Sequence, residues 1–173
     1  MVPVFVDESL VLLSRTPAVL EALLRDLPEA WVTATEGPDT WSPYDVVGHL
    51  IHAEKADWME RLIVILEHGP EKPFAAFDRE AQFRQVRLPL GALLDEFRGL
   101  REGNLARLRA LNLTEAQLGL QGTHPAFGVV TARQLLATWT AHDMAHLLQI
   151  SRVMAKRYKG EVGPWAAYLS VMK

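Results

Sequence analysis

The sequence predicts an all-α fold, and the simplest packing for it is a four-helix bundle. Four long segments carry apolar residues at helical spacing, helix start and stop signals separate them, and no segment alternates convincingly like a strand. The chain has 173 residues, the usual size of one domain, and its 49% hydrophobic content can fill a core. We therefore expect residues 1–173 to form a single four-helix-bundle domain.

The first helix is predicted from about Asp7 to Leu27, with Thr16-Pro17 inside it. Proline removes a backbone donor and restricts the residue before it, so a kink or a restart is expected there. The second helix is predicted to open at Ser42-Pro43-Tyr44-Asp45, where a serine cap, a proline at the first position and an early carboxylate all favour initiation. It should continue to about His68 and end at Gly69-Pro70.

The third helix is predicted from about Leu90 to Leu111, since leucines and Phe97 recur close to the 3.6-residue period. Gly99 and Gly103 should weaken it by ~1 kcal/mol each relative to alanine. Residues 71–88, before this helix, read as a packed connection with one short helical turn.

The fourth helix is predicted to begin at Thr131, whose hydroxyl can cap it while Gln134 reaches back, and to run to about Lys159. The loop 112–130 before it contains a capped turn at 114–117. A tail with Trp165 and Tyr168 follows and should pack as a short helix.

Composition excludes several classes of function. The net charge is −3 and no cluster of Lys and Arg is present, so we expect no nucleic-acid partner. The absence of cysteine excludes disulfides, thiolate ligands and a cysteine nucleophile. The longest aliphatic run, 62–66, is too short to span a membrane, and the first residues do not resemble a signal peptide. We therefore expect a cytoplasmic protein with no membrane partner.

Two histidines in the fourth helix have a spacing that metal sites use. His142 and His146 are four residues apart, which places both imidazoles on one helical face, and Leu135, Trp139 and Val153 share that face. Two adjacent buried imidazoles are costly unless their nitrogens are hydrogen-bonded or share a cation. Zinc, nickel, iron and manganese all accept neutral imidazole, although a pair at this spacing is as often a surface or core feature.

A third ligand must come from another helix, and the second helix offers His49 and, one turn on, His52. Periodicity does not decide between them, because that helix is apolar on more than one side. The small Ala53 and Ala56 share the direction of His49 and would leave room for a pocket, but they would equally suit close helix packing.

Several short runs together resemble the DinB/YfiT-like superfamily of metalloenzymes. They are Trp41-Ser42-Pro43, Val46-Val47-Gly48-His49-Leu50 with Glu54, Phe127-Gly128, Thr131, and His142-Asp143-x-x-His146-x-x-Gln149. The resemblance spans nearly the whole chain and implies a four-helix bundle in which one histidine of the second helix and two of the fourth bind a divalent metal beside a cavity. Position by position, it implies His49, His142 and His146 as ligands.

Three further residues are candidates for supporting the centre or binding substrate. Gln149 lies one turn beyond His146 on the same face, where it can orient a ligand or water, or be a buried amide satisfied by backbone. His52 has no counterpart among the family's ligands, and His124 lies in the loop before the fourth helix, where a loop hydrogen bond is its main expected role. Glu54, Asp57 and Asp143 are near in sequence but point away from the histidine faces, so no catalytic base is identified.

The resemblance implies a metal-dependent enzyme that acts on a small molecule. It suggests a thiol-dependent S-transferase, a hydrolase or an isomerase, and a low-molecular-weight thiol such as bacillithiol or mycothiol as co-substrate. A chain without cysteine fits an external thiol but does not require one. The alternative is a non-catalytic metal- or ligand-binding stress-response protein, and a homodimer is expected because family members often form dimers.

Overall fold

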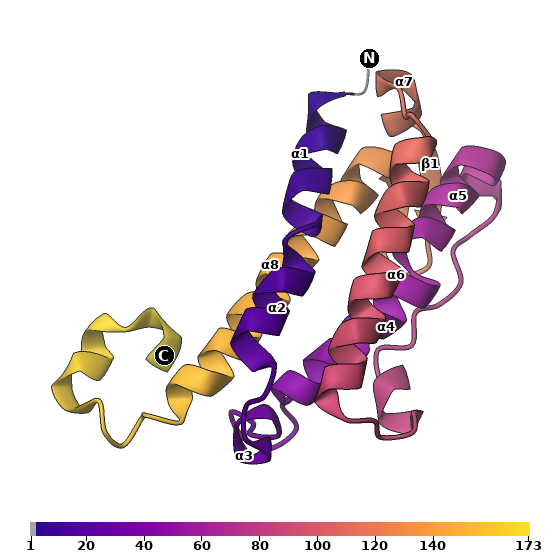
Figure 1. Ribbon diagram of the computed structural model, residues 1–173. Helices are drawn as coiled ribbons and strands as arrows, with labels where there is room; N and C mark the ends of the chain where they lie inside the picture. The colour runs from indigo at the N-terminus through magenta and orange to yellow at the C-terminus, as the bar shows by residue number, and fades with distance from the viewer. Residues whose placement is uncertain (1–2) are drawn as a thin grey trace.

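The computed structural model describes residues 3–173, so residues 1 and 2 of the predicted domain lie outside the described residues. Six helices build the four rods of a bundle (Figure 1): α1 (Val4–Leu13) with α2 (Thr16–Leu24), α4 (Pro43–Ala56) with α5 (Trp58–His68), α6 (Leu90–Ala110), and α8 (Ala132–Lys156). The prediction of an all-α four-helix bundle is confirmed. Helix α4 packs on both α6 and α8, which sets the geometry of the site described below.

The remaining elements are short. They are α3 (Glu29–Val32), α7 (Glu115–Leu118), the 3-10 helices η1 (Gly69–Glu71), η2 (Ala81–Arg84), η3 (Gly163–Tyr168) and η4 (Ser170–Met172), and the strands β1 (Gln121–His124) and β2 (Gly128–Thr131). Within residues 3–173, no helix combines the length and the apolar character needed to cross a membrane.

Two rods are interrupted, and only one interruption was predicted. The first falls at Thr16-Pro17, where α2 restarts with proline in its first turn, as expected. The second falls at Asp57, whose backbone (φ −117°, ψ −84°) separates α4 from α5. The prediction of one continuous helix to His68 was wrong at this residue. The buried Asp57 carboxylate pairs with Arg61 at 2.8 Å, so a local ion pair accompanies the break and no glycine or proline marks it in the sequence.

The expectation of no strand was also wrong. Strands β1 and β2 form an antiparallel hairpin that pairs Gln121 with Thr131, and β2 leads directly into α8. Gly122 permits close packing under the hairpin, because a Cβ there would lie 2.7 Å from Ile65 and 2.8 Å from Phe74. Two strands of four residues carry too little periodicity to be read from sequence.

The predicted caps are present at the helices that carry the site. Ser42 and Asp45 form a reciprocal capping box at the start of α4, and Thr131 and Gln134 form another at the start of α8. Each box satisfies two backbone donors that a helix start would otherwise leave free. These caps fix where the two helices begin, and hence which faces they turn toward each other.

Buried apolar side chains form two clusters along the bundle. One contains Leu13, Trp58, Leu62 and Trp139 and lies toward α5 and the hairpin, and the other contains Leu20, Leu50, Phe97 and Ile150.

The tail after α8 forms η3 and η4 beside the C-terminal end of α8 and extends away from the bundle (Figure 1). The tail forms a short helix at Gly163–Tyr168, as predicted, but the expected packing of Trp165 and Tyr168 is absent, because these side chains are 70% and 89% exposed.

Candidate metal centre

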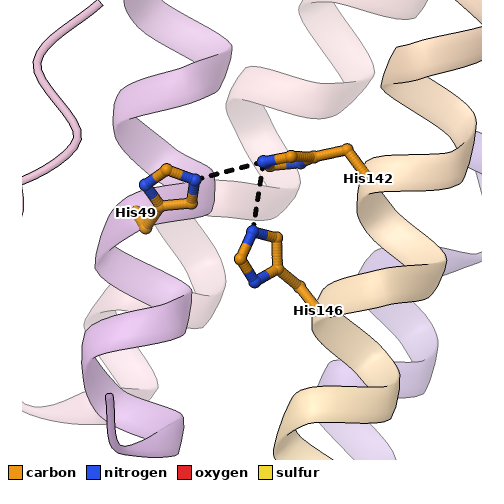
Figure 2. Close-up of side chains that lie close together, drawn as sticks. All are labelled: His49, His142 and His146. Atoms are coloured by element: carbon orange, nitrogen blue, oxygen red, sulfur yellow. Dashed lines mark hydrogen bonds between the residues drawn. The ribbon is translucent and has the colours of Figure 1, made fainter. Parts of the chain in front are cut away.

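Three imidazoles meet between α4 and α8. His49 comes from the second turn of α4, while His142 and His146 are one turn apart on α8 (Figure 2). Nε2 of His142 lies 3.1 Å from Nε2 of His49 and 3.1 Å from Nε2 of His146. One nitrogen from each residue can be chosen so that all three lie within 4.8 Å of one another. The Nε2 atoms are the inward-facing nitrogens (Figure 2).

This geometry fits one divalent transition metal ion. Imidazole nitrogens bind zinc at about 2.0 Å, so two of them on one tetrahedral ion lie about 3.3 Å apart. The two Nε2–Nε2 separations of 3.1 Å are close to that value. The histidine cluster is therefore compatible with a metal ion, and neutral imidazole alone does not distinguish zinc, nickel, iron and manganese.

The three rings are held in the neutral form that a metal requires. Burial, followed by the neighbouring imidazoles, lowers the pKa of His49 and His142 to about 3. Burial also lowers the pKa of His146, while its hydrogen bond with Gln149 acts in the opposite direction. At neutral pH each ring therefore keeps a lone pair available for coordination.

The outward nitrogens show how the rings are oriented. Nδ1 of His146 lies 2.9 Å from Oε1 of Gln149, a contact in which Nδ1 carries the proton and leaves Nε2 free to accept a metal. Nδ1 of His49 and Nδ1 of His142 are buried and have no hydrogen-bond partner among the described residues. Buried polar nitrogens without hydrogen-bond partners carry a desolvation cost. An ion bound at the centre would offset part of that cost.

Aromatic rings enclose the imidazoles. The Trp41 ring lies 4.8 Å from the His49 ring and stacks nearly parallel to the His146 ring at 6.2 Å. From the other side, the edge of Trp58 meets His142 at 5.0 Å. These contacts restrict rotation of the imidazole rings.

One side of the centre opens into a cavity of about 530 Å³. His146, Gln149 and Trp41 are among the residues that line it. Its remaining lining is strongly charged: Glu36, Asp39, Arg79, Glu80 and Arg152. A small molecule could enter here and approach the histidines from the His146 side.

A second polar cluster lies directly behind the histidines. Arg101 of α6 is 1% exposed and binds Asp143 through two hydrogen bonds, of 2.6 and 3.0 Å. The same guanidinium donates to Glu54 of α4 at 2.9 and 3.1 Å and to the backbone oxygen of Leu13 at 2.8 Å. Arg101 of α6 thus contacts the other three rods of the bundle, through α4, α8 and the C-terminal end of α1.

Neutral donors complete this cluster. Asn104 donates to the backbone oxygen of Glu54 at 2.8 Å and to its carboxylate at 3.0 Å. Trp139 donates to Glu54 at 3.1 Å, and the Thr16 hydroxyl donates to Asp143 at 2.5 Å. We call Arg101, Glu54, Asp143 and Asn104 the Arg101 cluster.

Comparison with known proteins identifies the family. The family model described as the DinB superfamily matches residues 12–150. The chain belongs to the DinB superfamily. A similar fold is found in a solved structure from Bacillus subtilis, described as YfiT, a probable metal-dependent hydrolase with an unusual four-helix bundle topology. That chain is 20% identical, the match covers 90% of this chain and 87% of that one, and the TM-score is 0.74. The chain has no significant match among curated proteins.

The predicted site residues of this DinB chain fall into two groups. His49, His142 and His146 are brought together, and Gln149 adjoins them. His52 is outside the cluster and packs against Phe77 in a tilted arrangement, with ring centroids 4.9 Å apart.

The third supporting candidate, His124, stabilises the hairpin turn. Its Nδ1 accepts from the backbone of Ala126 at 3.1 Å and of Phe127 at 3.3 Å. His124 does not line the cavity at the centre, so its predicted role as a loop hydrogen-bonder agrees with the structure.

The acidic residues near the ligands in sequence point away from them, as the helical count predicted. Glu54 and Asp143 belong to the Arg101 cluster, and Asp57 pairs with Arg61. None of the three lines the cavity at the centre, so none is placed to act as a base there.

Sequence reasoning missed a segment of the connection between α5 and α6 that packs over the histidine centre. The Phe77 ring meets the His49 ring edge-on at 5.6 Å, and Arg79 lines the cavity. This segment has no helical or strand period, so only the mixture of aromatic and charged residues between Pro73 and Arg84 could have marked it.

Proposed function

We propose that this DinB protein is a metal-dependent hydrolase acting on a small molecule, with His49, His142 and His146 as the metal ligands. The observation that carries the proposal is the convergence of three neutral imidazoles, one of which, His146, lines a cavity. The printed description of the Bacillus subtilis relative as a probable metal-dependent hydrolase supports the reaction class.

A divalent ion with three imidazole ligands and an open position lowers the pKa of a water molecule to about 7 and polarises a substrate oxygen. The chain's own residues prepare that chemistry. Burial keeps the imidazoles neutral, and Gln149 fixes the orientation of His146. Trp58 packs against His142, and Trp41 packs against His49 and also lines the charged cavity through which substrate would approach.

A second candidate, transfer of a low-molecular-weight thiol, is favoured by one further observation. Neither Glu54 nor Asp143 is free to remove a proton from water, because Arg101 holds both carboxylates. A thiol ionises more readily than water and needs a base less. The chain has no cysteine, so the thiol would be a co-substrate.

The test compares metal-loaded wild type with the His142→Ala variant on two panels. One panel contains small esters and amides, and the other contains an electrophile with each of several cellular thiols. Hydrolysis that is lost in the variant supports the first candidate, and thiol-dependent consumption of the electrophile supports the second. Metal-loaded protein without any rate above background on either panel would contradict both and favour a non-catalytic metal-binding role.

A dialysis control separates catalysis from folding. Metal removal should abolish the rate while the far-ultraviolet circular dichroism of the bundle persists. A bundle that melts on metal removal would instead indicate a structural site.

A further inference from the structure

Arg79 has a defined position beside the histidine centre. It lies two residues after Phe77, whose ring contacts His49, and two residues before η2. The turn between them is held by Asp78, which accepts a hydrogen bond from the backbone of Glu80 at 3.0 Å and pairs with Arg84. The backbone that carries Arg79 is therefore fixed on both sides, and the side chain lines the same cavity as His146 and Gln149.

The guanidinium of Arg79 is unpaired among residues 3–173, whereas the other arginine of the cavity is not. Arg152 holds Glu36 through two hydrogen bonds, of 2.9 and 2.8 Å, and Lys156 binds the same carboxylate at 2.8 Å. The neighbouring Asp78 carboxylate is used by Arg84. Five N–H donors of Arg79 are thus available to a molecule in the cavity.

The positive charge of Arg79 acts on all three imidazoles. Burial is the main reason that the pKa of His49, His142 and His146 is lowered, and the positive charge of Arg79 adds to that lowering in each ring. No other charged residue of the cavity has a resolved effect on any of the three.

The cavity also contains two carboxylates without an ion pair in the described chain, Asp39 and Glu80. A ligand that approaches His146 through this cavity can therefore meet Arg79 or these two carboxylates.

We propose that Arg79 binds an anionic oxyacid group, a carboxylate or phosphate, of the small molecule that this centre acts on. The guanidinium presents paired N–H donors in the plane that such groups accept. The reacting end of the molecule then lies at the open side of the histidine centre. This inference rests on the proposed function and adds a substrate class and a specificity-determining residue to it.

The experiment uses Co²⁺-loaded protein, whose visible absorption reports changes in coordination, and a matched set of hydroxamates of one length. The hydroxamate end binds the metal, and the other end is a carboxylate, a phosphonate, an uncharged carboxamide or an amine. Wild type should bind the better of the two anionic probes about tenfold more tightly than the carboxamide probe, the gain of one charge-assisted hydrogen bond. The better probe distinguishes carboxylate from phosphate.

Two variants test whether Arg79 causes the tighter binding of the anionic probe. Arg79→Gln should bring the ratio of affinities close to one while the carboxamide probe binds as before. Arg109→Gln removes the same charge from an exposed position on α6 outside the cavity and should leave the ratio unchanged.

The outcomes separate the inference from the proposed function. If the anionic and carboxamide probes bind equally, or if the preference survives Arg79→Gln, the assignment of Arg79 is overturned while the open metal centre stands. Tighter binding of the amine probe would also overturn it and would indicate Asp39 and Glu80 as the recognition groups. If no probe changes the absorption, the open centre itself is absent and the proposed function fails with the inference.

Discussion

Two buried polar clusters lie side by side in this bundle, and they differ in how completely their atoms are paired. Asp143 of the Arg101 cluster follows directly after His142 of the histidine centre, so one turn of α8 supplies both. In the Arg101 cluster, each carboxylate accepts from Arg101 and from at least one neutral donor. In the histidine centre, two outward nitrogens have no partner and three inward nitrogens face one another.

This difference separates a structural cluster from a binding site. A closed network of charges is stable without a ligand, since its members satisfy one another. An incomplete network of neutral nitrogens leaves free energy to be gained by binding a cation. The Arg101 cluster should therefore govern the stability of the bundle, and the histidine centre should govern its affinity for metal.

The largest effect, on the free energy of unfolding, is expected from removing Arg101 from the Arg101 cluster. Arg101→Met leaves Glu54 and Asp143 buried without their cation, and should lower the free energy of unfolding by about 3–5 kcal/mol. Urea denaturation in the presence of a chelator measures it. Arg109→Met, at an exposed position of the same helix, is the matched control and should stay within about 0.5 kcal/mol of wild type. Equal losses in the two variants would show that the cluster has no special role.

The pH dependence of metal-free protein should reveal the histidine centre. Unfolded chains protonate His49 and His142 near pH 6.5, but burial lowers the pKa of both to about 3 in the folded chain. The free energy of unfolding should therefore fall as the pH drops below 6.5, by about 1.4 kcal/mol per pH unit for each such proton. Burial raises the pKa of Asp57 to about 6, which opposes this trend by one proton between pH 3.8 and 6.

Urea titrations at pH 7, 6 and 5 with chelator present check this prediction. His142→Gln removes one of the titrating rings and should show a shallower fall. Stability that stays level, or rises on acidification, would mean that the imidazoles are not held neutral by burial.

A smaller effect, on metal affinity, is expected from Gln149, which orients His146. Gln149→Leu removes the acceptor beside Nδ1 of His146 and should weaken metal binding about tenfold. Gln149→Glu keeps an acceptor at that place and should retain the affinity. Competition with a chelator of known affinity measures both variants. If the leucine variant binds as tightly as wild type, Gln149 has no part in orienting His146.

The smallest effect is expected at His124. His124→Ala removes two hydrogen bonds of the hairpin turn and should lower the free energy of unfolding by about 1 kcal/mol. Metal content should not change, because His124 is outside the histidine cluster. Thermal denaturation and elemental analysis of the same preparation test both statements, and a loss of metal would place His124 in the centre after all.

Much of the fold could be predicted because its signals are local. The capping boxes at Ser42 and Thr131 and the restart at Pro17 follow from side chains within three residues of the backbone that they affect. The break at Asp57 and the hairpin at 121–131 depend on contacts with other parts of the chain, with Arg61 and with Ile65 and Phe74. Local patterns carry no information about such contacts.

The candidate site was likewise predictable only where local patterns determine it. The four-residue spacing placed His142 and His146 on one face, but periodicity left His49 and His52 open, and only the family resemblance pointed to His49. Gln149 followed from the same helical face as His146. Arg79 and Phe77 could not be found, because an irregular segment folds onto the centre only through tertiary packing.

The most direct test is the metal content of purified wild type beside His142→Ala. Both proteins are dialysed against a mixture of zinc, nickel, iron and manganese, then against metal-free buffer, and analysed for bound elements. Wild type should retain one equivalent of a divalent metal per chain, and the variant should retain almost none while its helical circular dichroism is unchanged. Wild type with no stoichiometric metal, or a folded variant that retains a full equivalent, would contradict a centre built from His49, His142 and His146.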